Sequence, residues 1–436
     1  MTATANRGLG VLSLATMLVS AHYGLGFLLG TAEKARTLGV GGSLYGVSIG
    51  LGTLAVFTLV EFYWTEIEQI WTLLGNRYGK SVKVGIGLMS WTSFIGIEAV
   101  QIIAAASILN VTGMPTLPTM LVLTFLFCIL SLLPVDKARW VFKGILLFNI
   151  ATLVYALWAL HGMSEYWRSP IEFIPSLRHM SATESLGISL STILLVVIDM
   201  KCHQFIVQAK DVRTAYLGCS VAALWLFGLA FLPSALVTAA QNAEILPPEL
   251  ASTAIVPYIL SWVAGGAHQL WGIVLIAALA VPALGLGSNV LRIQSKTLLD
   301  LDIVPNTRQN NILIAAINAL LALAIALKGG EIIDLILDFY AAYLSAALVP
   351  FIAYLLAHTR VFTFSHSSVR LSLAMSSLAA VAVLTIILFQ PTAIAFNSAE
   401  LTIMAVGVGF GGFGLLGTHA IEKYLLVSQT QEETQI

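Results

Sequence analysis

Glu98 and Gln101 stand inside an apolar stretch, 82–108, where polar side chains are costly to place in lipid. They are three residues apart, so on a helix they share one face. A glutamate at membrane depth is expensive unless it points into the protein. The pair therefore predicts a solute contact or a proton carrier; the alternative is an internal hydrogen bond. Trp91 precedes Glu98 on the same stripe and is a candidate for the wall of a solute pocket.

The first apolar stretch, 9–31, carries a glycine-rich run typical of an interrupted helix. An interrupted helix leaves carbonyl and amide groups unpaired, and these can bind a cation or the polar groups of a solute. We therefore predict Tyr23, Gly24 and Phe27 as solute contacts and Ser20 and His22 as ion-coupling residues. The alternative for the glycines is close packing of helices. For His22 it is a hydrogen bond to a neighbouring carbonyl.

A charged run lies at the end of the same stretch, between Gly30 and Gly39. Glu33, Lys34 and Arg36 stand where a helix facing lipid could not hold them. They are expected to form a cluster at the external mouth of the bundle.

Polar residues also interrupt two later stretches. Ser189 and Ser191 lie in 185–204 and could face a solute. Ser288 and Asn289 close the stretch 266–291 and are candidates for ion coupling. The bland alternative for such groups is capping or packing within the bundle.

The composition is that of an integral membrane protein. Of 436 residues, 58% are hydrophobic and 10% charged, and the mean hydropathy is +0.91. Soluble domains carry about 25% charged residues, so a water-soluble globule is excluded. The net charge of −1 gives no indication of nucleic-acid binding. The three cysteines lack metal-ligand spacing, and no nucleophile–base constellation predicts an enzyme.

Apolar stretches of about 20 residues match a hydrocarbon core of about 30 Å. They predict about twelve transmembrane helices and a short external helix near 247–257. The twelve stretches are 9–31, 40–63, 82–108, 117–135, 140–161, 185–204, 213–240, 266–291, 309–327, 332–357, 369–390 and 399–418.

The basic residues predict the orientation. With the N-terminus inside, sixteen of the 21 Lys and Arg residues fall in cytoplasmic segments and five in external ones. This positive-inside bias predicts that both termini are cytoplasmic.

Four stretches, taken in order, resemble the sodium:solute symporter family. They are Leu29-Gly30 with Gly39, the loop Asn76 to Lys80, the segment QFIVQAKD from Gln204 to Asp211 with the following Arg213-Thr214-Ala215, and GEIIDLILDFYAAYLSAALVP from Gly330 to Pro350.

The resemblance implies an all-α, leucine-transporter-type fold of the APC superfamily. Five helices are repeated with inverted topology, and the first and sixth are unwound at mid-membrane. The expected divisions are a cytoplasmic tail at 1–8, a first repeat at 9–161, an external loop at 162–184, a second repeat at 185–357, two peripheral helices at 358–424 and a disordered cytoplasmic tail at 425–436.

Two departures from the family put sodium coupling in doubt. In sodium-coupled relatives, two hydroxyl residues on the eighth helix face the first helix; the matching positions here are Leu286 and Gly287. Where the family commonly has an aspartate near the start of its fifth helix, this chain has Lys143. A lysine there could replace the cation and, when buried, loses its proton readily. The alternative for Lys143 is a snorkelling interfacial residue.

These observations predict a multi-pass transporter of the bacterial inner membrane that moves a small polar organic solute by alternating access. Coupling is expected to be sodium-independent, either to protons or facilitated; a sodium symporter with a displaced ion site is the alternative. A second alternative is a non-transporting sensor or partner subunit. The expected partners are the solute and membrane lipid, without nucleic acid, metal or cofactor beyond a coupling H⁺ or Na⁺, in a monomer or weak homo-oligomer.

Overall fold

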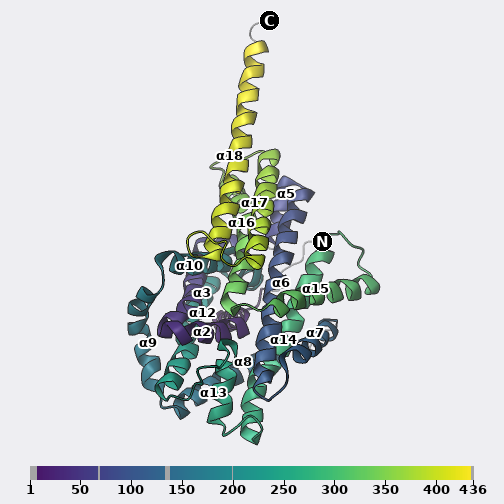
Figure 1. Cartoon of the computed structure of the whole chain (residues 1–436). Helices are drawn as coiled ribbons and strands as arrows, with labels where there is room; N and C mark the ends of the chain where they lie inside the picture. Colours follow the sequence, from purple (N-terminus) through teal and green to yellow (C-terminus); the bar gives the residue numbers. More distant parts are fainter. Residues whose placement is uncertain (1–6, 67–68, 133–137, 199, 434–436) are drawn as a thin grey trace.

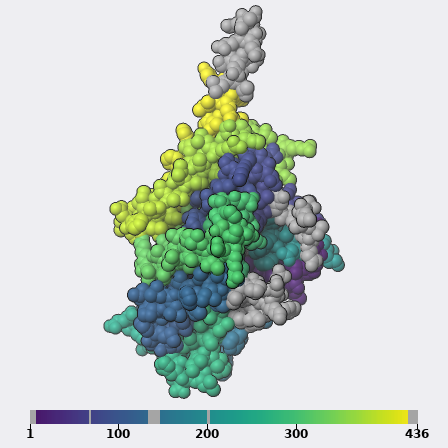
Figure 2. Space-filling model, turned by 90° about the vertical axis from the view of Figure 1, so that its right-hand side faces the viewer, coloured from purple at the N-terminus to yellow at the C-terminus, as the bar shows by residue number. Residues whose placement is uncertain are grey.

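The computed structural model describes the backbone of residues 7–66, 69–132, 138–198 and 200–433, and the side chains of these residues except 138–146, 200–202 and 425–433. The described chain is a bundle of helices (Figure 1). We call its two ends the α5 end, which is upper in Figure 1, and the α13 end, which is lower. Figure 2 shows the C-terminal helices, in yellow and light green, at the α5 end of the molecule.

The first predicted helix is interrupted, as the sequence indicates. α1 ends at His22, and α2 begins at Leu25. Between them, Gly24 is extended, with φ −115° and ψ −171°. Glycine fits this position because its backbone is the least restricted. The break therefore falls inside the predicted run, at Tyr23 and Gly24.

The first half of the chain contains the helices up to the first long bend. They are α1 (Val11–His22), α2 (Leu25–Leu38), η1 (Gly39–Ser43), α3 (Leu44–Ala55), η2 (Val56–Leu59), α4 (Val60–Thr65), α5 (Ile70–Tyr78), α6 (Lys80–Asn110), α7 (Thr116–Ser131) and α8 (Ala138–Ala159).

The predicted external loop at 162–184 is largely helical. α9 (Met163–Ser176) and η3 (Leu177–His179) follow α8 after a bend of 102°. The exposed Trp167, Ile171 and Ile174 recur at helical spacing on α9. Such an amphipathic helix suits the membrane interface, which explains why the segment is helical rather than irregular.

The second half begins with α10 and α11, which lie on either side of residue 199 and together form one candidate span, 182–206. Unwinding of this helix stays a prediction, because residue 199 lies outside the described residues. The helices are α10 (Ala182–Ile198), α11 (Met200–Ile206), α12 (Val212–Asn242), η4 (Ser252–Ala254), α13 (Ile255–Val263), α14 (Leu270–Asp300), α15 (Arg308–Lys328), α16 (Ile332–His358), α17 (His366–Phe389) and α18 (Ala399–Glu433). η4 and α13 overlap the short external helix predicted near 247–257.

In the described residues, nine helices are long and apolar enough to cross a membrane, or ten if the bent pair of α8 with α9 and η3 is one span. The predicted all-helical membrane fold is therefore confirmed. The number differs from twelve mainly because α2 to α4 run on as one apolar segment, Leu25–Thr65, and because α1 and α7 are short.

α6 and α16 form the centre of the bundle, since most residues of their apolar stretches are buried. α18 packs on α16 and α17 through small residues: a Cβ on Gly411 would lie 3.0 Å from Ser376 Cβ, and one on Gly414 would lie 3.1 Å from Ser372 Cα. Small residues allow such close approach of helices in membranes. α18 continues to Glu433, so most of the predicted disordered tail, 425–436, is helical in the structure.

Several contacts connect the segment before α1 to the rest of the bundle. The backbone N–H of Leu9 donates to Gln208 O at 3.0 Å, and the N–H of Lys210 donates to Leu9 O at 3.1 Å. The Arg7 guanidinium lies 3.8 Å from the centre of the Trp64 ring, and Trp64 Nε1 donates to Ala209 O at 3.0 Å. The beginning of α1 and the end of α11 are thus held side by side.

We expect Gly42→Ala to destabilise the protein. A Cβ at this position would overlap the backbone of Ala35, at 2.7 Å from its Cα, and backbone cannot move aside cheaply. Overpacking of this kind costs typically about 1–3 kcal/mol. The apparent melting temperature in detergent should fall. Gly412→Ala is the matched control, because a Cβ there meets nothing within 4 Å; equal melting temperatures would contradict the prediction.

Candidate functional site

A cavity of about 280 Å³ opens between the central helices and the elements of the α5 end. Polar and aromatic side chains line it together, which is typical of pockets for small ligands. Its lining comes from α5, α6, α11, α14, α16 and the residue before α5, and comprises Gln69, Trp71, Ser90, Ser93, Phe94, His203, Gln204, Val207, Ile293, Lys296, Thr297, Asp300, Tyr340 and Tyr343.

The predicted solute-binding residues are not in this lining. Gln101 is nevertheless related to it: it follows the cavity residue Phe94 by seven residues, so both lie on one face of α6, about 10 Å apart along the helix. Sequence reasoning missed Ser90, Ser93 and the two tyrosines of α16. A signal for them exists, because Ser90 and Ser93 are spaced three apart and both tyrosines lie in the family-like stretch 330–350.

His203 joins one wall of the cavity to the end of α4. Its Nε2 lies 2.6 Å from the backbone oxygen of Glu66, and its ring stacks on Tyr63 with the ring centres 4.9 Å apart. His203 is buried, and its Nδ1 has no hydrogen-bond partner in the described part of the chain. This histidine therefore keeps one ring nitrogen for further contacts.

An apolar side chain stands against the break between α1 and α2. Leu286 Cδ1 would lie 3.5 Å from a Cβ on Gly24. Gly287 faces α7 instead, since a Cβ there would lie 2.5 Å from the Phe127 ring. Two positions match the family's sodium-binding hydroxyls. At the first, Leu286 places a methyl group at the break; at the second, Gly287 faces the neighbouring helix α7.

The predicted hydroxyl ligands bond back to their own helices. Ser20 Oγ donates to Met17 O at 2.9 Å, and Ser288 Oγ donates to Gly285 O at 3.1 Å. Ser191 Oγ donates to Gly187 O at 2.6 Å. Asn289 and Ser189 are half-buried. The structure does not bring Ser20 and Ser288 into a shared hydrogen bond, and their ion-coupling role stays a prediction.

The remaining predicted ion-coupling residues are His22 and Lys143. His22 is half-buried at the end of α1 and has an interaction partner. The side chain of Lys143 lies outside the described residues, although its backbone is part of α8.

Tyr23 and Phe27 form an aromatic row at the break. Their ring centres are 5.0 Å apart, and the Phe27 and Tyr45 ring centres are 6.3 Å apart. The buried Tyr23 hydroxyl has no hydrogen-bond partner among the described residues. A buried hydroxyl without a partner is costly. It would be satisfied by a polar group of a solute at the break, which agrees with the predicted role of Tyr23 and Gly24.

Glu98 is not among the residues that line the cavity. It follows Trp91 by seven residues, so the two lie close together around α6. The Trp91 indole donates to Asn318 Oδ1 on α15 at 3.0 Å. Glu98 is fully buried, and neither of its carboxyl oxygens has a hydrogen-bond partner in the described chain. Its role as a solute contact or a proton carrier stays a prediction.

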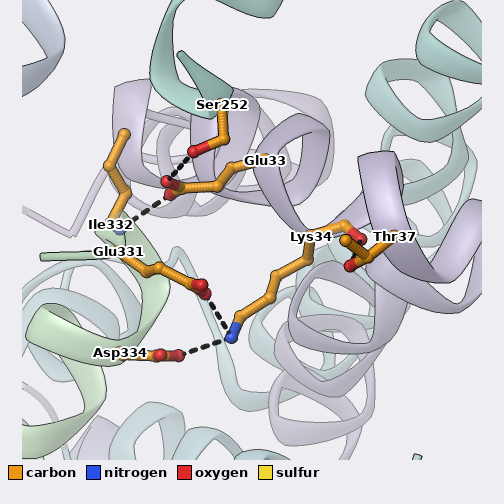
Figure 3. Close-up of polar contacts among 7 residues, drawn as sticks. All are labelled: Glu33, Lys34, Thr37, Ser252, Glu331, Ile332 and Asp334. Atoms are coloured by element: carbon orange, nitrogen blue, oxygen red, sulfur yellow. Dashed lines mark hydrogen bonds and ion pairs between the residues drawn. The ribbon is translucent and has the colours of Figure 1, made fainter. Parts of the chain in front are cut away.

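At the α13 side of the break, charged residues tie α2 to α16 (Figure 3). Lys34 Nζ lies 2.6 Å from Glu331 Oε2 and 2.9 Å from Asp334 Oδ1. Glu33 accepts hydrogen bonds from the Ser252 hydroxyl and from the backbone N–H of Ile332, both at 2.8 Å. The second bond places a carboxylate at the N-terminus of α16, where negative charge is favoured.

Arg36 adds a third connection on the same helix. Its guanidinium donates to the backbone oxygens of Pro248, at 2.7 Å, and of Leu250. Together, Glu33, Lys34 and Arg36 bind α2 to α16 and to residues 247–252. We call this set of contacts the outer closure, because the basic residues predict that the α13 end is external. The charged run forms a cluster, as predicted, and its place at the external mouth stays a prediction.

The hollow beside the outer closure is minimal. Lys34, Tyr45 and Ile333 are among the residues that line a space of about 10 Å³, roughly the room for one water molecule. The larger cavity is at the α5 end. Of these two spaces, the one at the α5 end is therefore much the larger.

Two polar groups near the α5 end have capping roles. Asp211 accepts from the Thr214 backbone N–H at 2.6 Å at the start of α12, and this hydrogen bond lowers the pKa of the Asp211 carboxyl. Arg292 donates to Leu130 O and Ser131 O, both at 3.0 Å, at the end of α7. In the described part of the chain, His, Cys, Asp and Glu form no group of three that could hold a metal ion.

Comparison of the whole chain with solved structures identifies the architecture. A Na⁺-coupled sialic acid symporter in a substrate-bound outward-open state superposes with a TM-score of 0.70 at 13% identity, covering 96% of this chain and 92% of that one. This chain has a leucine-transporter-type fold. A manganese transporter from Eremococcus coleocola has a TM-score of 0.55 at 12% identity, with coverage of 95% and 98%, and a mutant of it has a TM-score of 0.54 at 12% identity, with coverage of 93% and 94%. No protein-family model and no curated protein matches the sequence.

The solved structures that share this fold are those of transporters. In such transporters, broken helices supply backbone groups to a site near the midplane, and two halves move around that site. The described break between α1 and α2 is a break of this kind.

Proposed function

We propose that this protein is a secondary transporter that moves a small polar organic solute by alternating access. The observation that carries the proposal is the difference between two spaces: a cavity of about 280 Å³ at the α5 end and room for about one water molecule beside the outer closure. Alternating access requires states that are open to one side only. The basic residues predict that the α5 end is cytoplasmic, and we propose on this ground that the structure represents a state open to the inside.

The size and lining of the cavity suit a small polar solute. Pockets for drug-sized ligands have volumes of about 300–1,000 Å³, and this cavity lies just below that range. Its hydroxyl, amide and imidazole groups offer hydrogen bonds, and Tyr340, Tyr343 and Trp71 offer apolar faces. We propose that the solute passes from the predicted contacts Tyr23, Gly24, Phe27 and Gln101 into this cavity.

We further propose that the chain is a divergent member of the sodium:solute symporter family that works without sodium. The Leu286 side chain at Gly24 supports this, because a methyl group cannot ligate a cation. Ser20 and Ser288 bond to their own helices, which also favours sodium independence. Protons are the coupling ion that we favour over facilitated transport, since the buried Glu98 can exchange one.

The similarity to a Na⁺-coupled symporter supports a second candidate, sodium coupling at a displaced site that uses Ser288 or Asn289. Ser288 would have to exchange its bond to Gly285 for a cation.

We expect purified protein to show no sodium-specific stabilisation. A ligand that binds only the folded state raises its stability by about 2.7 kcal/mol at one hundred times its Kd. The apparent melting temperature should therefore be the same in sodium chloride and in choline chloride of equal ionic strength. A screen of solute classes under both conditions should find a stabilising solute, whose uptake into proteoliposomes is then measured with and without sodium. A steep sodium requirement would favour the displaced-site symporter, and a solute that binds but is never transported would favour the sensor.

A further inference from the structure

A second layer of acidic residues lies beneath the outer closure. Asp338 follows Asp334 by four residues on α16, so both side chains are on one face of the helix. Asp338 is only 7% exposed, and its Oδ1 has no hydrogen-bond partner among the described residues. The closure's single lysine, Lys34, is already paired with Glu331 and Asp334.

Glu400 on α18 completes this layer. It is also 7% exposed. Its Oε1 lies against α10, at 2.6 Å from where a Cβ on Gly187 would be. Only a glycine leaves room for a carboxyl at this place. Glu400 therefore sits between α18 and α10.

The charged groups around Asp338 and Glu400 are mostly acidic. On the same helix as Asp338 are Glu331 and Asp334. α2 contributes Lys34 and α15 ends with Lys328. α10 contributes Glu184, which acts on Asp334, and Glu400 acts on Asp338. With Glu33 of α2, closing α2 onto α16 gathers six carboxyls near two ammonium groups. Three of the carboxyls, Glu33, Asp338 and Glu400, are buried.

Carboxylates in such a place must be neutralised. An ionised carboxyl loses its hydration on burial, and like charges repel more strongly where water is excluded. A proton on the carboxyl removes both costs. When the mouth opens, water reaches the acids and the proton can leave.

We propose that Asp338 and Glu400 form a proton-binding site, loaded from the α13 side, whose occupancy allows the outer closure to form. Its ligand is the proton, and its four elements are α2, α10, α16 and α18. The inference rests on alternating access, and it concerns the balance between the closed and open mouth rather than the coupling of the solute. Acid outside favours the closed mouth, and alkaline conditions favour the open one.

Opening of the outer mouth can be measured with a cysteine introduced at a buried position of α2, without knowledge of the solute. Thr31 is fully buried, and its hydroxyl has no partner in the described chain; it precedes Lys34 by three residues, on the same face. Thr31→Cys is made with Cys128, Cys202 and Cys219 replaced by serine. Proteoliposomes are then treated with a membrane-impermeant maleimide. Thr37→Cys, exposed on the same helix, corrects for orientation and for the pH dependence of the thiol reaction itself.

The corrected labelling of Thr31→Cys should rise at least about fivefold between roughly pH 5.5 and roughly pH 8.5, because protons leave the acids as the solution becomes more alkaline. With Asp338→Asn and Glu400→Gln together, labelling should stay low at both pH values, because the amides mimic the protonated acids. Each single variant should show a reduced pH response. Glu249→Gln is the matched control, an exposed acid near the same mouth, and it should keep the full response.

The outcomes separate the inference from the proposed function. Labelling that occurs but does not depend on pH in the native protein overturns the proton site and leaves alternating access intact. A full pH response in the Asp338→Asn, Glu400→Gln protein does the same. Absence of labelling at every pH overturns both.

Discussion

Lys34→Met should open the outer mouth and abolish most transport. The substitution keeps the length of the side chain and removes the ammonium that binds Glu331 and Asp334. The Lys34 side chain is 15% exposed, so its two ion pairs are shielded from water on one side, whereas the two acids are about half exposed. Their loss should cost the closed state roughly 1–2 kcal/mol, a factor of about 5–30 in the ratio of closed to open molecules.

The effect on transport follows from the cycle. A transporter that cannot close its outer mouth does not pass the solute to the other side. Uptake of the solute found by the screen should fall on the order of tenfold, while labelling of a cysteine at position 31 should increase. Lys423→Met is the matched control, because Lys423 is exposed on α18 and lies outside the outer closure. Normal uptake by Lys34→Met protein would show that the closure is dispensable.

Glu98→Gln should uncouple transport from the proton gradient. Glutamine has nearly the shape of a protonated glutamate but cannot release a proton. Accumulation driven by a pH gradient should therefore fall on the order of tenfold, the equivalent of about 1.4 kcal/mol. Exchange of labelled for unlabelled solute at equal pH should persist, because that reaction needs no net proton movement.

The comparison distinguishes a proton carrier from a structural acid. If Glu98 only packs against its neighbours, glutamine should be tolerated and accumulation of the solute should be unchanged. Glu172→Gln, on the exposed side of α9, should behave like the native protein. Loss of both accumulation and exchange in Glu98→Gln, with a lowered melting temperature, would identify damage to the bundle instead.

Much of the architecture was accessible from the sequence, because lipid imposes simple rules. A segment in hydrocarbon must satisfy its backbone internally, so apolar stretches of spanning length had to be helices. The glycine-rich run around Tyr23 and Gly24 predicted the break between α1 and α2, because glycine and polar residues have few other roles at that membrane depth. The charges Glu33, Lys34 and Arg36 could be placed at a mouth for the same reason.

The contacts of individual side chains could not be predicted from the sequence, because they depend on which helices pack together. The spacing of Glu98 and Gln101 suggested a common role, yet the sequence could not tell which neighbouring helices their face of α6 meets. Likewise, nothing local to Asp338 or Glu400 reveals that α16 and α18 pack together. These two residues are about sixty positions apart in the sequence, and their relation follows from helix packing.

The sequence by itself therefore determined a helical membrane protein with an interrupted first helix, an acidic and basic mouth, and no hydroxyl at Leu286. Only the tertiary structure decided that Leu286 stands against Gly24, that Lys34 pairs with α16, and that the cavity opens at the α5 end. The reason is physical: burial in lipid acts on each segment separately and leaves its mark on composition, whereas cavities and ion pairs arise between segments, where the rotation of each helix sets which side chains meet.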